Sequence, residues 1–161
     1  MKSKRIIGID PALTKAGWGV IEVNGNSFKF VACGLIKTDA SLELTKRLYH
    51  LHQELIAAIK FYKPHEAAIE ETFINMNPTS SLKLGHARGA LMLTLGLCEL
   101  SVFEYSTTSI KKSVVGVGRA EKQQIQAMIK ILLPNNKVQS EDEADALATA
   151  ICHVNNFRKY K

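Results

Sequence analysis

The sequence contains only three cysteines, four prolines and one tryptophan, and it has no long uninterrupted run of apolar residues. Cys33, Cys98 and Cys152 are an odd number and widely spaced, which excludes a framework of paired disulfides and disfavours a zinc site. The basic residues 1–5 are followed by a short strand pattern instead of the apolar core of a signal peptide or a membrane span. We therefore expect a cytoplasmic protein with reduced thiols.

Acidic residues are in the minority, because 21 Lys and Arg residues oppose 15 Asp and Glu residues and leave a net charge of +6. Such a surplus favours a polyanionic partner over a small neutral ligand. The length of 161 residues suits one domain, and no linker rich in proline, glycine or serine divides it. We expect one domain over residues 1–157 and a short basic tail over residues 158–161.

Strand and helix patterns alternate along the chain after an opening group of three strands. The predicted strands are residues 5–10, 17–23, 28–36, 65–70 and 102–105, and the predicted helices are residues 41–62, 79–98, 109–115, 120–133 and 141–156. Asn24 and Gly25, between the second and third strands, are typical of a tight hairpin. Because a helix is the usual connection between parallel strands, this order predicts an α/β fold with a mixed five-stranded sheet flanked by helices.

Two acidic residues stand at the ends of predicted central strands. Asp10 ends one apolar run and precedes Pro11, and Glu70 ends another. Taken alone, an aspartate at a strand end is more often a turn former than a catalytic group. The carboxyl ends of central strands in an α/β sheet meet at a common crevice, however, so these two carboxylates can converge.

A second group of acids opens the last predicted helix. It comprises Glu141, Asp142, Glu143 and Asp145. Acids at a helix start are favoured by the helix dipole, and Ser140 is a natural cap, but four acids exceed what capping requires. Asp142 and Glu141 both lie near Asp145 on a helix, so spacing alone cannot choose between them. The sequence therefore predicts a divalent-cation site made by four carboxylates, with its fourth member undecided.

A band of basic residues surrounds a loop that contains two glycines. Lys111 and Lys112 precede residues 116–118, and Arg119 and Lys122 follow them. Backbone amides at a helix start can hold phosphate, although solvated surface lysines are the usual alternative. The loop lacks the final glycine of a dinucleotide fingerprint and follows no strand, which argues against a Rossmann site.

The predicted helix at residues 79–98 is apolar nearly all round from Ala87 onward. One covered face does not account for that pattern. Gly85, Gly89 and Gly96 permit another helix to approach closely. We therefore expect one face of this helix to pack on the sheet and the other to pack against the same helix of a second copy, forming a homodimer.

Motifs in the same order over nearly the whole chain resemble the RuvC family of Holliday-junction resolvases. They are Gly8-Ile9-Asp10-Pro11, Ala68-Ile69-Glu70, residues 81–89, residues 114–118 with Ala120-Glu121-Lys122, and residues 143–148. The resemblance implies a ribonuclease H-like fold and a homodimer that cuts four-way DNA junctions with magnesium in recombination and repair, beside a branch-migration motor. It also implies that the catalytic acids are Asp10, Glu70, Asp142 and Asp145, which favours Asp142 over Glu141.

The same four carboxylates would hold two Mg²⁺ ions per subunit, with Mn²⁺ as a substitute. Two ions roughly 3.5–4 Å apart can stabilise both the attacking and the leaving oxygen of a phosphodiester displacement. Water would be the nucleophile, and the resemblance implies products with 5′-phosphate and 3′-hydroxyl ends.

The candidate DNA contacts are Phe73, Lys83, Arg88, Lys111, Arg119 and Lys122. The resemblance implies that Phe73 stacks on a base near the branch point, a contact that contributes about 1–3 kcal/mol. A loop anchor packed on the core is a nearly even alternative for that residue. Lys111 and Lys122 are the stronger candidates for phosphate or catalytic-site contacts, and Lys83 and Arg88 are the lesser ones.

Three rival functions differ in substrate or chemistry. A ribonuclease H-like nuclease with another substrate would not prefer a four-way junction to linear duplex. A junction-binding protein without catalysis would bind without Mg²⁺ and would not nick, but all four acids are present. An actin-like ATPase needs two such domains and more phosphate loops than this length supplies.

Overall fold

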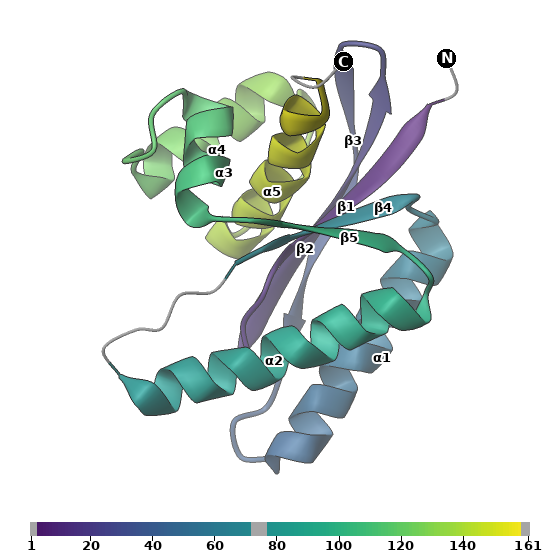
Figure 1. Ribbon diagram of the computed structural model, residues 1–161, viewed down its shortest axis with the longest axis vertical. Coiled ribbons are helices and arrows are strands. Elements are labelled where there is room, and N and C mark those ends of the chain that lie inside the picture. Colours follow the sequence, from purple (N-terminus) through teal and green to yellow (C-terminus); the bar gives the residue numbers. More distant parts are fainter. Residues whose placement is uncertain (1–2, 72–76, 159–161) are drawn as a thin grey trace.

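A computed structural model describes residues 3–71 and 77–158. Its centre is a five-stranded sheet with the strand order β3-β2-β1-β4-β5 (Figure 1). The strands are β1 (Lys4–Asp10), β2 (Lys15–Asn24), β3 (Ser27–Lys37), β4 (Glu66–Glu70) and β5 (Ser101–Tyr105). β1, β2 and β3 pair antiparallel, whereas β4 pairs parallel with both β1 and β5. The predicted mixed five-stranded sheet is confirmed.

Helices cover both faces of the sheet (Figure 1). They are α1 (Leu44–Tyr62), α2 (Pro78–Leu97), α3 (Thr107–Val115), α4 (Lys122–Leu132) and α5 (Glu141–Arg158). α5 crosses β1 and β2, and α3 and α4 pack against α5, while α1 and α2 pack together under the opposite face. Within the described residues, no helix has the length and apolar character needed to span a bilayer.

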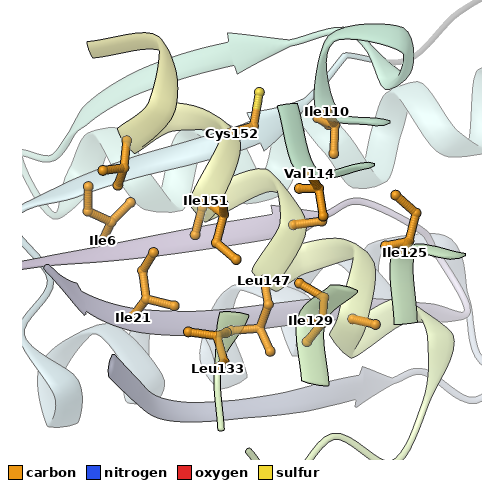
Figure 2. Packing of buried hydrophobic residues seen from close by; sticks show 14 of the residues in the cluster. Ile6, Ile21, Ile110, Val114, Ile125, Ile129, Leu133, Leu147, Ile151 and Cys152 are labelled. Atoms are coloured by element: carbon orange, nitrogen blue, oxygen red, sulfur yellow. The ribbon is translucent and has the colours of Figure 1, made fainter. Parts of the chain in front are cut away.

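The apolar run of β1 is buried on both faces, as expected of a central strand with parallel and antiparallel neighbours. Ile6 packs into the core beneath α5, whereas Ile7 and Ile9 pack into the core against α1 and α2. Figure 2 shows the first of these cores, in which side chains of α3, α4 and α5 meet Ile6 and Ile21 of the sheet. Because side chains alternate along a strand, Gly8 and Asp10 face the same side as Ile6, toward α5.

Glycines let α5 lie unusually close to the sheet. A Cβ atom built on Gly8 would lie 2.0 Å from the carbonyl oxygen of Ala146, and one built on Gly19 would lie 2.6 Å from the Leu147 side chain. Neither distance is possible for a real side chain. The glycines of β1 and β2 therefore set the distance between the sheet and the helix that carries Asp142 and Asp145.

The helix boundaries differ from the sequence expectation by a few residues. α1 begins at Leu44 instead of residue 41, and α4 begins at Lys122 instead of residue 120. At α4 the reason is a capping box, in which Glu121 and Gln124 exchange side-chain and backbone hydrogen bonds and so define the first turn. α5 extends to Arg158, one residue into the tail expected at 158–161. The predicted hairpin is confirmed, but its two-residue loop is Gly25 and Asn26, because Asn24 still pairs with Ser27. Gly25, at the first loop position, has a positive φ of +57°, which suits glycine.

Candidate active site

Asp10 and Glu70 lie at neighbouring strand ends on the face of the sheet that α5 covers. β1 and β4 run parallel with Ile9 opposite Ile69, so the next residues, Asp10 and Glu70, end these neighbouring strands side by side. Ile69 points into the core under α1 and α2. Alternation therefore turns Glu70, like Asp10, toward α5. The register between β1 and β4 therefore brings the Asp10 and Glu70 carboxylates together, as their positions at the two strand ends predicted.

The first turn of α5 is held against β2 beside these strand ends. A Cβ atom built on Gly17 would lie 2.2 Å from the carbonyl oxygen of Asp142, so only glycine permits this approach. Gly17 also pairs with Asp10 across β1 and β2. The backbone of Asp142 thus lies against the residue that pairs with Asp10, which joins the two halves of the acid cluster.

The electrostatics of Asp10 show that the four acids act on one another. Burial raises the pKa of Asp10 to about 8, with further contributions from the charges of Glu70, Asp145 and Asp142. Burial also raises the pKa of Asp145 to about 6, and Glu70 is the largest charge contribution to that shift. The Lys122 ammonium opposes both shifts by lowering the two pKa values. A cluster of this kind, with carboxylates that burial and mutual repulsion make costly to ionise, is typical of a functional site.

The neighbouring acids at the start of α5 have separate contacts. The Lys122 ammonium lies 2.8 Å from a carboxylate oxygen of Glu141, and both side chains are largely exposed. Glu143 is buried and accepts hydrogen bonds from the backbone N–H groups of Gln139 and Ser140, at 2.7 and 2.9 Å. Glu143 therefore caps the helix. Asp142 contributes to the raised pKa of Asp10, and both Asp142 and Glu141 contribute to the raised pKa of Asp145, so the choice between these two acids rests on the family resemblance.

The donor set fits hard divalent cations, because all four side chains offer carboxylate oxygens. Within residues 3–71 and 77–158, no three His, Cys, Asp or Glu side chains gather closely enough to form a complete metal site as they stand. Like-charged carboxylates repel one another, and a bridging cation offsets that repulsion. One oxygen of Glu70 also accepts a hydrogen bond from the Thr107 hydroxyl. The cluster therefore matches a metal site in the type of its ligand atoms, although its side chains are not already arranged around a cation.

A pocket of about 140 Å³ opens beside the acids. Its lining residues are Glu70, Thr107, Ile110, Lys111, Lys122, Ile125 and Asp145. Two carboxylates and two ammonium groups therefore share one small concavity with the apolar side chains of Ile110 and Ile125. Lys111 and Lys122, which were predicted from the basic band, lie where a phosphate beside the acids would need positive charge.

The other predicted DNA contacts are dispersed. Arg119 and Lys83 are exposed, the second on α2. Arg88 instead makes internal contacts: its guanidinium pairs with Glu104 and donates to the backbone carbonyl of Glu70 at 3.3 Å. Its side chain is only 17% exposed. The structure thus links Arg88 to the strand end that carries Glu70. Phe73 lies outside the described residues.

Sequence reasoning missed Thr107. This residue begins α3 and shares the pocket with the acids. No motif marks it, because a threonine at a helix start is an ordinary capping-region residue. Only the pairing of β4 with β5 brings it to Glu70.

Two acids at adjacent strand ends, with two more on a helix packed across the same face, define a ribonuclease H-like nuclease domain. The chain belongs to the RuvC family, because the model of the family "Crossover junction endodeoxyribonuclease RuvC" matches residues 6–153.

Relatives and solved structures agree with that assignment. The chain is 52% identical to crossover junction endodeoxyribonuclease RuvC of Rhizobium meliloti over 152 residues, which cover 94% of this chain and 89% of the relative. The corresponding protein of Agrobacterium fabrum is 50% identical over 155 residues, covering 96% and 91%. Among solved structures, Thermus thermophilus RuvC in complex with a Holliday junction substrate matches with a TM-score of 0.91 at 26% identity, covering 98% of this chain and 96% of that one.

Proposed function

We propose that this protein is a structure-selective endonuclease that resolves four-way DNA junctions by paired, symmetric nicks in recombination and repair. The observation that carries the proposal is the acid cluster at the ends of β1 and β4, within a chain that matches the RuvC family from residue 6 to residue 153. The relatives are named crossover junction endodeoxyribonucleases, and the Thermus relative was solved with a Holliday junction. The whole of residues 1–157 acts as one nuclease domain.

The four carboxylates of Asp10, Glu70, Asp142 and Asp145 hold the cofactor, which we take to be two Mg²⁺ ions per subunit with Mn²⁺ as a substitute. When bound, such ions lower the pKa of an attacking water and offset charge on the departing 3′ oxygen. The products then carry 5′-phosphate and 3′-hydroxyl ends. Support comes from the donor chemistry and from the raised pKa values of Asp10 and Asp145, which burial and like charge produce and a cation would reverse.

Lys111 and Lys122 draw the scissile phosphate into the pocket beside the acids. Both residues line that pocket. The positive charge of Lys122 is close enough to the acids to lower the pKa of Asp10. Its partner Glu141 is exposed, so exchanging that ion pair for a phosphate costs little. Arg119 and Lys83 contact the DNA backbone on either side of the cleavage site. Phe73 stacks on a base near the branch point of the junction. Arg88 contributes by holding the end of β4.

The enzyme works as a homodimer built on α2. One face of this helix is buried, through Ala87, Leu91 and Leu95. Its other face leaves Leu93 and Leu97 at 64% and 62% exposure, and a Cβ atom on Gly89 would meet nothing within 4 Å. A two-fold pair of these faces buries apolar surface and places one active site on each of two opposed DNA strands.

The biological setting follows from the substrate. A junction cutter needs a junction positioned for it, so we place this enzyme beside a branch-migration motor. Its DNA substrate assigns it to the compartment that holds the chromosome, which in bacteria such as the relatives is the cytoplasm.

The direct test is incubation with a synthetic four-way junction and with linear duplex of the same sequence, in Mg²⁺ and in EDTA. We expect Mg²⁺-dependent nicks on the junction only, and none with Asp10→Asn. Equal cutting of the linear duplex would point to a nuclease with another substrate. Tight junction binding with no nick under any metal would indicate a non-catalytic binding protein.

A further inference from the structure

Thr107 is in contact with the acid cluster although it is neither an acid nor a base. Its hydroxyl donates a hydrogen bond to one carboxylate oxygen of Glu70. Thr107 also lines the pocket that contains Asp145, Lys111 and Lys122. The contact therefore occurs within the proposed active site and joins α3 to it.

The backbone around this contact is held firmly on both sides. Glu70 pairs with Tyr105 at the ends of β4 and β5, and the N–H of Glu71 donates to the Tyr105 carbonyl at 2.8 Å. On the other side, the Ser106 side chain caps α3 by accepting from the N–H of Ser109 at 3.2 Å. Thr107 stands between these two constraints, and its β-branched side chain has few rotamers. The hydroxyl is thus presented to Glu70 by a rigid segment.

The position of Thr107 at the start of its helix leaves its hydroxyl available. Within a helix, a threonine hydroxyl commonly donates to the carbonyl four residues earlier. Thr94 and Thr149 both do so here, to the carbonyls of Ala90 and Asp145 at 2.8 and 2.9 Å. Thr107 is the first residue of α3, so the residue four positions earlier belongs to β5 and not to a helical turn. Its hydroxyl turns to Glu70 instead.

A partner outside the acid cluster suits Glu70, because like-charged carboxylates repel one another. The charge of Glu70 is the largest charge contribution to the raised pKa of both Asp10 and Asp145, and that repulsion acts equally on Glu70. A hydrogen bond from outside the cluster opposes it. The hydrogen bond from Thr107 holds one of the two Glu70 carboxylate oxygens and leaves the second one available to a cation.

We propose that Thr107 is a positioning residue, which orients the Glu70 carboxylate for divalent-cation binding through its hydroxyl. This role rests on the proposed metal-dependent function. Hydrogen bonds to ligating carboxylates typically change metal affinity or activity by about 10–100-fold when they are removed. We expect an effect at the lower end of that range, because a single neutral hydroxyl is involved.

Thr107→Val is the informative variant, because it keeps the shape of the side chain and removes only the hydroxyl. Thr107→Ser restores the hydroxyl and should restore binding. Thr108→Val is the matched control, since Thr108 is the exposed next residue of the same helix. Thermal unfolding in EDTA verifies that all three variants are folded.

Direct Mn²⁺ binding, followed by electron paramagnetic resonance without DNA, is the primary measurement. We expect Thr107→Val to weaken Mn²⁺ binding by about tenfold, Thr107→Ser to restore it to within about threefold, and Thr108→Val to bind normally. The double variant with Thr107→Val and Glu70→Gln should bind Mn²⁺ no more weakly than Glu70→Gln alone, because Thr107 acts only through its contact with Glu70.

The outcomes separate this proposal from the function itself. Normal Mn²⁺ affinity in Thr107→Val overturns the positioning role, as does a loss that Thr107→Ser does not reverse. The Mn²⁺ titration requires no DNA cleavage, so it decides the role of Thr107 even if the wild-type protein fails to cut a four-way junction. That failure would count against the proposed function alone.

Discussion

Replacing Asp10 with asparagine should stabilise the metal-free protein, and the gain should grow with pH. Burial and the neighbouring acids raise the pKa of Asp10 from 3.8 to about 8 in the folded protein. The folded state therefore holds this proton more tightly than the unfolded chain does. The stability that this provides is fully present below the unfolded pKa of 3.8 and is lost as the pH rises toward 8.

The size of the effect follows from the titration. Each pH unit between the two pKa values costs at most about 1.4 kcal/mol of unfolding free energy. Raising the pH from about 5 to about 7 therefore costs up to about 3 kcal/mol, and we expect about 1–2 kcal/mol because Lys122 and water can move toward the charge. The asparagine side chain of the variant does not titrate, so the variant avoids this loss.

The assay is urea unfolding in EDTA at several pH values, with wild type and Asp10→Asn compared at each. Asp39→Asn is the control, because Asp39 is exposed and its pKa is lowered by hydrogen bonds from Ser41. That variant should gain no stability as the pH rises. Adding Mg²⁺ at high pH should stabilise wild type more than Asp10→Asn. A difference between wild type and Asp10→Asn that stays constant from about pH 5 to about pH 7 would refute the reasoning.

Three further predictions concern packing, assembly and a buried histidine. Gly8→Ala should cost about 3 kcal/mol in urea unfolding, because its Cβ would lie 2.0 Å from the Ala146 carbonyl oxygen; a loss below about 1 kcal/mol would show that α5 can move away. Leu93→Lys should give a monomer in sedimentation, whereas Ile131→Lys on α4, equally exposed, should remain dimeric; a dimeric Leu93→Lys protein would exclude α2 as the interface. Burial lowers the pKa of His153 below 6.5, so its neutral form stabilises the fold above that pH. The stability of wild type relative to His153→Gln should therefore fall as the pH drops below 6.5, and a difference in stability that does not change with pH would contradict this prediction.

The sheet and the strand-end acids could be predicted because they depend on local patterns. Asp10 and Glu70 follow short apolar runs, and the parallel pairing of central strands brings such ends together. The choice between Asp142 and Glu141 could not be made locally. Both lie on the first turn of α5 and both raise the pKa of Asp145, so the preference for Asp142 rests on the resemblance to the RuvC family.

Long-range partners account for the internal contacts of Arg88 and for the contact of Thr107 that sequence reasoning missed. Arg88 was grouped with the DNA contacts because its charge suits phosphate. Its internal partners, Glu104 and the Glu70 carbonyl, come from β5 and β4, and composition gives no information about them. Thr107 reaches Glu70 across 37 positions of sequence through the register of the same two strands. The sequence shows that a residue is charged or polar, but the residue it contacts depends on the register between β4 and β5.

The central claim is that two identical active sites make paired cuts across a four-way junction. A supercoiled plasmid that extrudes a cruciform tests it in one gel, because two opposed nicks within one binding event give linear DNA and a single nick gives a relaxed circle. With Mg²⁺, wild type should produce mainly linear plasmid, and Asp10→Asn should produce neither product. Relaxed circles as the main product of the wild-type enzyme, accumulating before any linear DNA, would contradict paired cutting.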